Sequence, residues 1–323
     1  MTHIPLRVLV SGVGGFIGAQ VARRILEEGH QVFGVDDFST GYHENVPEGL
    51  ELIVHDLAKR DIHESLPEKC DVILHLAGQY SGEMSFDDPV ADLEKNAHST
   101  LNLIHYGIAV GARRLVYASS MSVYGNVPDL PVNEKTACRP LTCYGNSKLA
   151  TERYLSIYQK KLPCVIFRMF NVYGPGQNMA NLRQGMVSIF MAQMMKGENV
   201  QVKGSLERFR DFIFIDDVVE AWHQTTISDR ADGRILNLGT GCRTSVLELL
   251  ECMAQHFSLA TWFTQDQTPG DQLGIYADTS NLCAVLGFDK FTDLKDGLGR
   301  FTAWAEDSDQ NLNVMDKKRG CPR

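Results

Sequence analysis

The feature that most constrains the fold is a short apolar run that leads through a glycine-rich turn into a helical pattern. The run covers residues 6–11, the turn covers residues 12–18, and Val21, Ile25 and Leu26 follow at helical spacing. Glycines let the backbone turn tightly and approach a phosphate, and the free N–H groups of a helix N-terminus attract negative charge. We therefore expect a strand, a turn that binds the phosphates of a dinucleotide, and a helix.

A second apolar run, residues 31–35, ends in Asp36, about twenty residues after the glycines. A carboxylate at this strand end accepts hydrogen bonds from a ribose 2′-hydroxyl and repels a 2′-phosphate. We therefore predict that the chain binds NAD and not NADP. Alternatively, Asp36 is an ordinary loop carboxylate at the start of the turn formed by residues 37–41.

Strand and helix patterns keep alternating along the first half of the chain, which is typical of parallel strands connected by helices. We predict an α/β fold with a Rossmann-type doubly wound parallel sheet. After about residue 176 the alternation loosens, which indicates a smaller, mixed α/β substrate domain. Asp216 and Ser245 are predicted N-caps there. The further strands are expected at 52–54, 72–78, 114–118, 164–167, 199–202 and 235–239, and the helices at about 89–110, from Tyr144, and at 184–196.

The predicted domain boundaries follow from this change of pattern. Residues 1–170 form the NAD-binding domain, to which a segment at about 212–240 returns. Residues 171–211 and 241–305 form the substrate domain, and the polar residues 306–323 are expected to be a mobile tail.

Tyr144 and Lys148 lie four residues apart, so on a helix they share one face, where an ammonium favours the phenolate of a neighbouring tyrosine. Ser120, at the end of the strand expected at 114–118, is placed to hydrogen-bond a substrate oxygen. These three side chains form a candidate catalytic set that removes a proton from a hydroxyl while a hydride leaves the same carbon. The alternative for Tyr144 and Lys148 is an ordinary pair on a helix surface.

Composition excludes several other classes. The 323 residues are 44% apolar, enough for a large core, and a net charge of −9 with a pI near 5.6 gives no reason to bind nucleic acid or an anionic membrane. The N-terminus lacks the pattern of a signal peptide, and no stretch is apolar enough to span a bilayer, so we expect a cytoplasmic enzyme. Eight unevenly spaced cysteines without a C-x-x-C pair are expected to be reduced core thiols, with no metal site.

Taken together, the motifs resemble the extended short-chain dehydrogenase/reductase family, and within it the nucleotide-sugar epimerase/dehydratase branch, of the UDP-glucose/UDP-galactose 4-epimerase type. The resemblance extends from Val8 to about Phe301. The motifs that carry it are Gly12-x-x-Gly15-Phe16-Ile17-Gly18, residues 36–41, His75-Leu76-Ala77, Asn96, Ser120-x-x-Val123-Tyr124-Gly125, Tyr144-x-x-x-Lys148, Arg168-x-Phe170-Asn171, Arg210-Asp211, Asn237-x-Gly239 and Gly270-Asp271.

The resemblance assigns roles to the catalytic residues. It implies that Tyr144 is the base, that Lys148 lowers the pKa of Tyr144 and holds the nicotinamide ribose, and that Ser120 polarises the reacting oxygen. Ser119 and Ser122 are rivals for the last role. We favour Ser120 because the family places its Ser or Thr four residues before the Tyr of the Val-Tyr-Gly triplet, here Tyr124.

The same resemblance, with the pattern of strand ends, predicts the binding residues. Asn171 and Arg210 match the contacts of the family to the substrate diphosphate, and the alternative for Arg210 is a surface ion pair with Asp211 or Glu207. The expected NAD contacts are Gly12, Gly15, Phe16, Ile17, Gly18, Asp36, Asp37, Phe38, Ser39, Thr40, Gly41, Asp56, Leu57, Leu76, Ala77, Gly78, Asn96, Ser119, Tyr144, Lys148, Phe170 and Val172, and the expected substrate contacts are Tyr80, Ser120, Ser122, Asn171, Arg183, Arg210 and Asp271.

The residues after Ser120 bear on the type of reaction. Dehydratases and decarboxylases of this branch carry an acidic residue there, because losing water or CO₂ needs additional acid-base help. Here the positions hold Met121 and Ser122. We therefore predict an isomerase, a 4-epimerase that oxidises C4 of the sugar transiently and returns the hydride to the other face of the rotated 4-keto sugar. The alternatives are a 4-keto reductase, a 4,6-dehydratase in which Glu83 is the acid, and, more remotely, a non-catalytic NAD-binding scaffold.

Two departures leave the nucleotide and the sugar open. Gln267 and Thr268 stand where many such epimerases have a second phosphate-binding Arg, for which Arg183 is a candidate replacement. The loop after Ala77 has Gln79 and Tyr80 where a Lys or Arg is common. The resemblance also implies a homodimer formed through helices at about 90–110 and 145–161.

Overall fold

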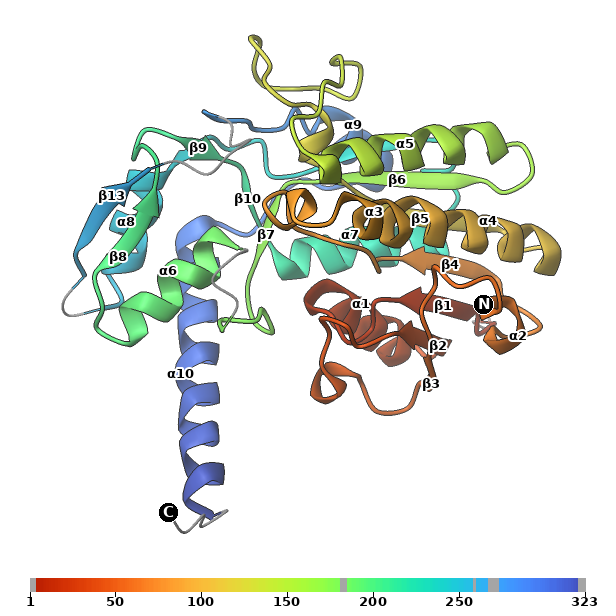
Figure 1. Ribbon diagram of the computed structural model, residues 1–323, viewed down its shortest axis with the longest axis horizontal. Helices are drawn as coiled ribbons and strands as arrows, with labels where there is room; N and C mark the ends of the chain where they lie inside the picture. The colour runs from red at the N-terminus through yellow and green to blue at the C-terminus, as the bar shows by residue number, and fades with distance from the viewer. Residues whose placement is uncertain (1–3, 181–184, 258–259, 267–272, 319–323) are drawn as a thin grey trace.

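The protein is described by a computed structural model that covers residues 4–180, 185–257, 260–266 and 273–318, with side chains up to residue 307. Its centre is a sheet of seven parallel strands (Figure 1). These strands are β1 (Arg7–Ser11), β2 (Gln31–Asp36), β3 (Glu51–Val54), β4 (Val72–His75), β5 (Arg114–Ser120), β6 (Cys164–Met169) and β11 (Ile235–Leu238).

The spatial order of the strands is β11, β6, β5, β4, β1, β2 and β3, so the chain reverses its direction of progress between β1 and β4. This order confirms the predicted Rossmann-type doubly wound sheet. In such sheets a crevice opens beyond the carboxyl ends of the strands at the point of reversal. The glycine-rich turn after β1 and the loop after β4 meet at this point.

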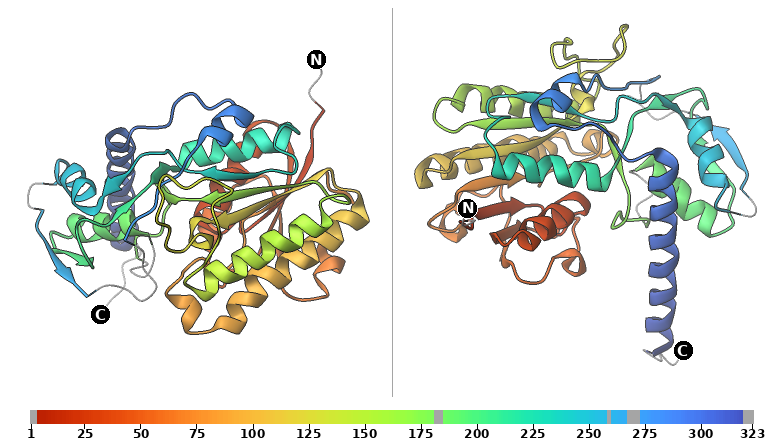
Figure 2. Two further views of the ribbon diagram at one scale, coloured as in Figure 1. Left: turned by 90° about the horizontal axis from the view of Figure 1, so that it is seen from above. Right: turned by 180° about the vertical axis from the view of Figure 1, so that it is seen from behind.

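Helices cover both faces of the sheet, as the view from above shows (Figure 2). One face packs against α1 (Phe16–Glu27), α7 (Ile215–Ile227) and α9 (Ser280–Leu286). The other face packs against α2 (Ile62–Ser65), α4 (Ser99–Val110) and α5 (Cys143–Tyr158). Consecutive residues of the inner strands are therefore buried, which explains why these strands read as continuous apolar runs, whereas most of the edge strand β3 is exposed.

A smaller part of the molecule lies beyond one end of the sheet and has its own apolar core, which includes Phe190, Phe214, Leu250 and Phe301. The helix α9 packs on the large sheet although it falls within the segment expected in the substrate domain, and the domain boundaries stay a prediction. The elements of this part are β7 (Asn171–Tyr173), α6 (Met186–Met195), β8 (Val200–Lys203), β9 (Phe209–Arg210), β10 (Phe212–Phe214), β12 (Thr244–Ser245), α8 (Val246–Ala254), β13 (Trp262–Gln265) and α10 (Leu294–Lys318).

The helix expected at 89–110 is interrupted. It consists of α3 (Pro89–Leu93), a π-helical turn (Glu94–His98, labelled η3) and α4. The wider turn lets Lys95 reach the loop after β2 while its neighbour Asn96 is completely buried. The sequence pattern does not reveal this interruption, because apolar residues keep their three-to-four spacing through it.

The two predicted N-caps have different outcomes. Ser245 caps α8 in a capping box with Glu248, as predicted. The prediction for Asp216 is wrong: Phe214 is the N-cap of α7, and Asp216 lies in the first turn, where it pairs with Arg300. A carboxylate in the first turn is still favourable to the helix dipole.

The C-terminal helix α10 continues past Glu306 to Lys318 and extends away from the rest of the molecule (Figure 1). The mobility expected of residues 306–323 stays a prediction. No helix among the described residues is both long enough and apolar enough to cross a bilayer. Of the cysteines, Cys70 and Cys164 are buried, whereas Cys242 is exposed and is not the core thiol that was expected.

Candidate functional site

A cavity of about 660 Å³ lies along the carboxyl ends of the central strands. We refer to it as the central cavity. It is lined by the predicted NAD residues except Phe38 and Asn96, and by Tyr80, Ser120, Ser122 and Asn171 of the predicted substrate residues. Arg210 does not line it, and Arg183 and Asp271 lie outside the described residues.

The glycine-rich turn forms one wall of the central cavity. Gly12 has φ of +78°, and a Cβ at this position would lie only 2.9 Å from the backbone nitrogen of Ala77, so a larger residue is excluded. The turn leads into α1, whose N-cap is Gly15 and whose N-terminus has no side-chain cap and no acidic residue in its first turn. Its N–H groups are therefore available to a phosphate.

Asp36 organises the loop beside this turn. Its carboxylate accepts hydrogen bonds from the backbone nitrogens of Gly14 at 2.9 Å and Phe38 at 2.8 Å. The ring of Phe38 stacks on His43 with 3.6 Å between centroids, so it supports the loop and does not line the central cavity. Asp36 is buried at the end of β2, where its negative charge disfavours a 2′-phosphate.

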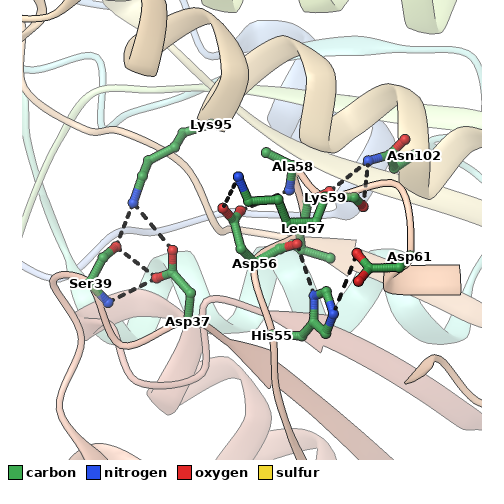
Figure 3. Close-up of polar contacts among 10 residues, drawn as sticks. All are labelled: Asp37, Ser39, His55, Asp56, Leu57, Ala58, Lys59, Asp61, Lys95 and Asn102. Atoms are coloured by element: carbon green, nitrogen blue, oxygen red, sulfur yellow. Dashed lines mark hydrogen bonds and ion pairs between the residues drawn. The ribbon is translucent and has the colours of Figure 1, made fainter. Parts of the chain in front are cut away.

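A polar contact joins the π-helical turn to the loop after β2, and Figure 3 shows its three side chains. Lys95 of the π-helical turn donates to Asp37 Oδ2 at 3.3 Å and to Ser39 Oγ at 2.5 Å, and all three residues line the cavity. We refer to this contact as the Lys95 clasp. Sequence reasoning did not find it, because Lys95 and Asp37 are separated by 58 residues and no local pattern connects them.

Asp56 follows β3 on the same side of the central cavity (Figure 3). One carboxylate oxygen of Asp56 accepts the backbone N–H of Ala58 at 2.9 Å, and Asn102 of α4 donates to the carbonyl of Leu57 at 2.8 Å. These bonds hold the loop after β3 against α4. The loop is thereby held in place at the predicted NAD contacts Asp56 and Leu57.

His75, at the end of β4, connects three elements that surround the cavity. Ser11 Oγ accepts the N–H groups of Leu76 and Ala77 at 3.0 Å, so its own hydrogen points to His75 Nδ1 at 2.7 Å. Thr100 donates its hydroxyl hydrogen to the carbonyl of Asn96, so it accepts from His75 Nε2 at 2.9 Å. His75 is therefore neutral with its hydrogen on Nε2, and burial lowers its pKa to about 3.

The catalytic candidates meet at the centre of the cavity. Tyr144 and Lys148 lie in the first turns of α5, whose N-cap Thr142 accepts the N–H of Gly145 at 3.0 Å. Lys148 Nζ donates to the carbonyl of Ala118 at 2.9 Å and lies 5.7 Å from the centroid of the Tyr144 ring. Ser120 hydrogen-bonds Tyr144 from β5. The structure thus brings the three predicted residues together.

Burial is the main influence on the protonation of Tyr144 and Lys148. Burial raises the pKa of Tyr144 to about 12, and the hydrogen bond with Ser120 lowers it only in part. Burial lowers the pKa of Lys148 to about 8. The net pKa of Tyr144 is raised in the protein alone because burying the phenolate is costly, and the lowering effect expected of Lys148 stays a prediction.

The structure separates Ser120 from its rival Ser119. Successive residues of a strand point to opposite sides, and Ser119 Oγ donates to Glu152 of α5 at 2.5 Å. Glu152 also forms a bidentate pair with Arg168 of β6, and both residues are more than nine-tenths buried. All three serines line the cavity, but the hydroxyl of Ser119 is engaged by the carboxylate of Glu152.

The substrate side is less well matched to the predictions. Asn171 lines the central cavity, but its Nδ2 donates to the carbonyl of Asp211 at 3.1 Å. Arg210 is buried and donates to the carbonyl of Phe209, so the alternative of a surface ion pair is wrong. Burial and the neighbouring Arg208 lower the pKa of Arg210 to about 10.

Glu83, the candidate acid of a dehydratase, lies outside the lining of the central cavity and forms an ion pair with Lys203 of β8 at 3.6 Å. Residues that sequence reasoning missed also line the cavity, among them Gln177, Met186 and Phe212. They come from the smaller part of the molecule, where no periodic signal marks a strand end.

Comparison with known proteins identifies the family. The chain matches the NAD dependent epimerase/dehydratase family over residues 8–239. It belongs to this family. A UDP-glucose 4-epimerase of Mycolicibacterium smegmatis is 34% identical over 258 residues, which are 77% of this chain and 82% of that protein.

Two solved structures resemble this member of the NAD dependent epimerase/dehydratase family over almost its whole length. The UDP-glucose 4-epimerase of Thermotoga maritima with UDP-glucose is 29% identical with a TM-score of 0.87, and the match covers 94% of this chain and 99% of that one. The UDP-glucose 4-epimerase of Thermus thermophilus in complex with NAD is 31% identical with a TM-score of 0.84, and the match covers 93% and 99%.

The residues of this epimerase/dehydratase fit NAD, the cofactor of the family. The uncapped N-terminus of α1 and the turn at Gly12 suit a pyrophosphate, and Asp36 suits a ribose without a 2′-phosphate. Near Lys148, a Cβ on Gly78 would lie 2.5 Å from Asn96 Oδ1 and 3.3 Å from Lys148 Nζ. Only glycine keeps this space free, which suits the close approach of a planar ring.

Proposed function

We propose that this member of the family is an NAD-dependent UDP-sugar 4-epimerase. The observation that carries the proposal is the arrangement of Ser120, Tyr144 and Lys148 around one cavity with the cofactor residues, together with Met121 and Ser122 where an acid would support dehydration. The nucleotide is inferred from the relatives, whose names specify UDP-glucose. The hydroxyl configuration and the substituents of the sugar are left open.

The reaction needs one group that takes a proton from the sugar and returns it. NAD held by the residues of the central cavity would supply the acceptor and donor of the C4 hydride. Ser120 holds the O4 atom by a hydrogen bond, and Tyr144 accepts the O4 proton as a phenolate and later donates it. Lys148 stabilises that phenolate by its charge, because its ammonium lies near the Tyr144 ring. No proton and no hydride is consumed over the whole cycle.

Two observations disfavour the alternatives within the family. Glu83 pairs with Lys203 and does not line the central cavity, so it is poorly placed to be the acid of a dehydratase. Met121 Sδ accepts from Asn171 Nδ2 at 3.6 Å, and an apolar side chain there offers no proton. A non-catalytic scaffold would not require Ser120, Tyr144 and Lys148 to converge.

The test is to assay the purified protein without added cofactor. We expect bound NAD and the conversion of UDP-glucose to UDP-galactose, or of another UDP-sugar to its C4 epimer, observed by proton NMR. A Tyr144→Phe variant should keep its NAD and lose about 10²- to 10⁴-fold in turnover. Stoichiometric consumption of NADH or NADPH would indicate a reductase, and a new methyl signal would indicate a dehydratase.

We further propose a homodimer formed through α3 and α5. Large apolar side chains are exposed on these neighbouring helices: Val90 at 65%, Leu93 at 51%, Tyr154 at 41% and Ile157 at 72%. Exposing several neighbouring apolar side chains to water is unfavourable, and such a patch is typical of a protein–protein interface.

A further inference from the structure

Asp92 is a buried carboxylate next to the catalytic residues to which the proposed reaction assigns no role. It lies on α3, is 1% exposed and lines the central cavity. Its Oδ1 accepts from Asn96 Nδ2 at 3.2 Å, while Oδ2 has no hydrogen-bond partner among the described residues. Burying a carboxylate with one unpaired oxygen is costly unless a positive charge opposes it.

The positive charge that opposes Asp92 is Lys148. Asn96 and Ser147 connect the two residues, because Asn96 Nδ2 donates to Ser147 Oγ at 3.1 Å and Ser147 directly precedes Lys148 on α5. Asn96 Oδ1 and Lys148 Nζ also face the same small space above Gly78. The side chains of Asp92, Asn96, Ser147 and Lys148 therefore form one buried polar cluster that joins α3, the π-helical turn and α5.

The charges around Lys148 are few. Tyr117 of β5 offers its ring face 4.9 Å from Nζ, His75 of β4 is neutral, and Tyr144 is a phenol in the protein alone. Glu152, one turn further along α5, is neutralised by Arg168. Within the part of the chain that the structure describes, Asp92 is the carboxylate that acts on Lys148.

Asp92 raises the pKa values of both Lys148 and Tyr144. Its negative charge raises the pKa of Lys148, against the burial that lowers it to about 8. It also raises the pKa of Tyr144, in the same direction as burial. In return, Lys148 and the hydrogen bonds of Ser147 and Asn96 lower the pKa of Asp92, which burial raises.

We propose that Asp92 is a positioning residue of the catalytic centre, whose carboxylate keeps Lys148 an ammonium and, through Asn96 and Ser147, fixes that side chain between Ala118 and Tyr144. The inference deepens the proposed function and rests on it for the assay of turnover. Asp92 does not exchange a proton with the substrate. It determines the pH range in which Tyr144 and Lys148 work together.

The test compares Asp92→Asn with Glu94→Gln, which removes one charge from an exposed position two residues away. Asparagine keeps the shape of Asp92 and an oxygen that accepts from Asn96 Nδ2, but it removes the charge. We expect both limbs of the pH profile of kcat to move to lower pH, by about one unit, because both pKa values fall. The pH profile of Glu94→Gln should coincide with that of the unchanged protein. In Asp92→Glu, which keeps the charge, both limbs should return to the pH values of the unchanged protein.

A second measurement does not depend on turnover. The ultraviolet absorbance of tyrosinate is titrated in the NAD-loaded protein, and the Tyr144 contribution is obtained by subtracting the same titration of Tyr144→Phe. In the Asp92→Asn background this contribution should appear at lower pH. If the asparagine variant does not fold, Asp92→Ser, which is smaller and also uncharged, is used in both measurements.

The outcomes separate this inference from the proposed function. If both limbs of the pH profile of Asp92→Asn stay at the pH values of the unchanged protein, Asp92 has a structural role only and the inference is wrong. This holds whether or not the variant loses activity at every pH. If the unchanged protein does not epimerise any UDP-sugar, the proposed function fails, and the tyrosinate titration alone decides the role of Asp92.

Discussion

At the scale of single residues, the neighbouring hydroxyls of Ser119 and Ser120 have different tasks. Ser119→Ala removes the donor to Glu152 within a buried ion pair, so the free energy of unfolding should fall by about 1–3 kcal/mol while the folded enzyme keeps its turnover within a few-fold. Ser120→Ala should instead lower kcat by about 10²- to 10³-fold with little effect on stability. Urea unfolding and the NMR assay measure the two effects, and the reverse pattern would show that the roles are exchanged.

His75 makes the stability of the protein dependent on pH. The unfolded chain binds a proton at this side chain near pH 6.5, whereas the folded chain does so only near pH 3, so lowering the pH through this window favours the unfolded state. From pH 7.5 to pH 5, the protein should lose about 2 kcal/mol of unfolding free energy more than a His75→Gln variant. Urea unfolding at both values measures this. Parallel losses in the two proteins would contradict a neutral, buried His75.

At the scale of elements, the Lys95 clasp connects the π-helical turn to the loop after β2 across the central cavity (Figure 3). Both charged partners are about one-third exposed, so the clasp contributes little to folding. It should slow the release of the cofactor, because Lys95, Asp37 and Ser39 all line the cavity in which NAD is expected to bind. Lys95→Met should release NAD up to about five-fold faster, with the thermal midpoint almost unchanged.

The release of NAD is measured after dilution of the purified protein, at low and at high salt. Salt should reduce the difference between Lys95→Met and the unchanged protein, since it screens the ion pair. Lys196→Met, at an exposed position after α6, is the matched control and should release NAD at the original rate. Equal rates for Lys95→Met and the control would mean that the clasp does not retain the cofactor.

At the scale of the whole molecule, the apolar residues of α3 and α5 predict that two copies associate through these helices. Ile157→Asp places a charge at the most exposed of these positions and should shift the protein from dimer to monomer in sedimentation velocity. Ile227→Asp, on α7 at the opposite face of the sheet, is the control, since Ile227 is 48% exposed but distant from α3 and α5. A monomeric unchanged protein, or dissociation by the control, would contradict the proposed interface.

The sequence by itself determined the features that depend on neighbouring residues. The glycine turn before α1, the carboxylate of Asp36 at the end of β2 and the helical spacing of Tyr144 and Lys148 are local patterns, because backbone geometry fixes the positions of nearby residues. The alternation of strands and helices also predicted a parallel, doubly wound sheet, whereas the order of its strands came from the structure. These patterns were sufficient for the fold class. Together with the family resemblance they predicted about half of the residues that line the central cavity.

Only the tertiary structure decided what depends on packing between distant segments. The engagement of Ser119 by Glu152, the Lys95 clasp, the network of His75 and the convergence of Asp92 on Lys148 join residues that are far apart in the sequence. The protonation of Tyr144 and Lys148 also belongs here, since burial decides it and burial is a property of the folded molecule. The spacing of two residues on a helix predicts that they meet, but not the dielectric surroundings in which they do so.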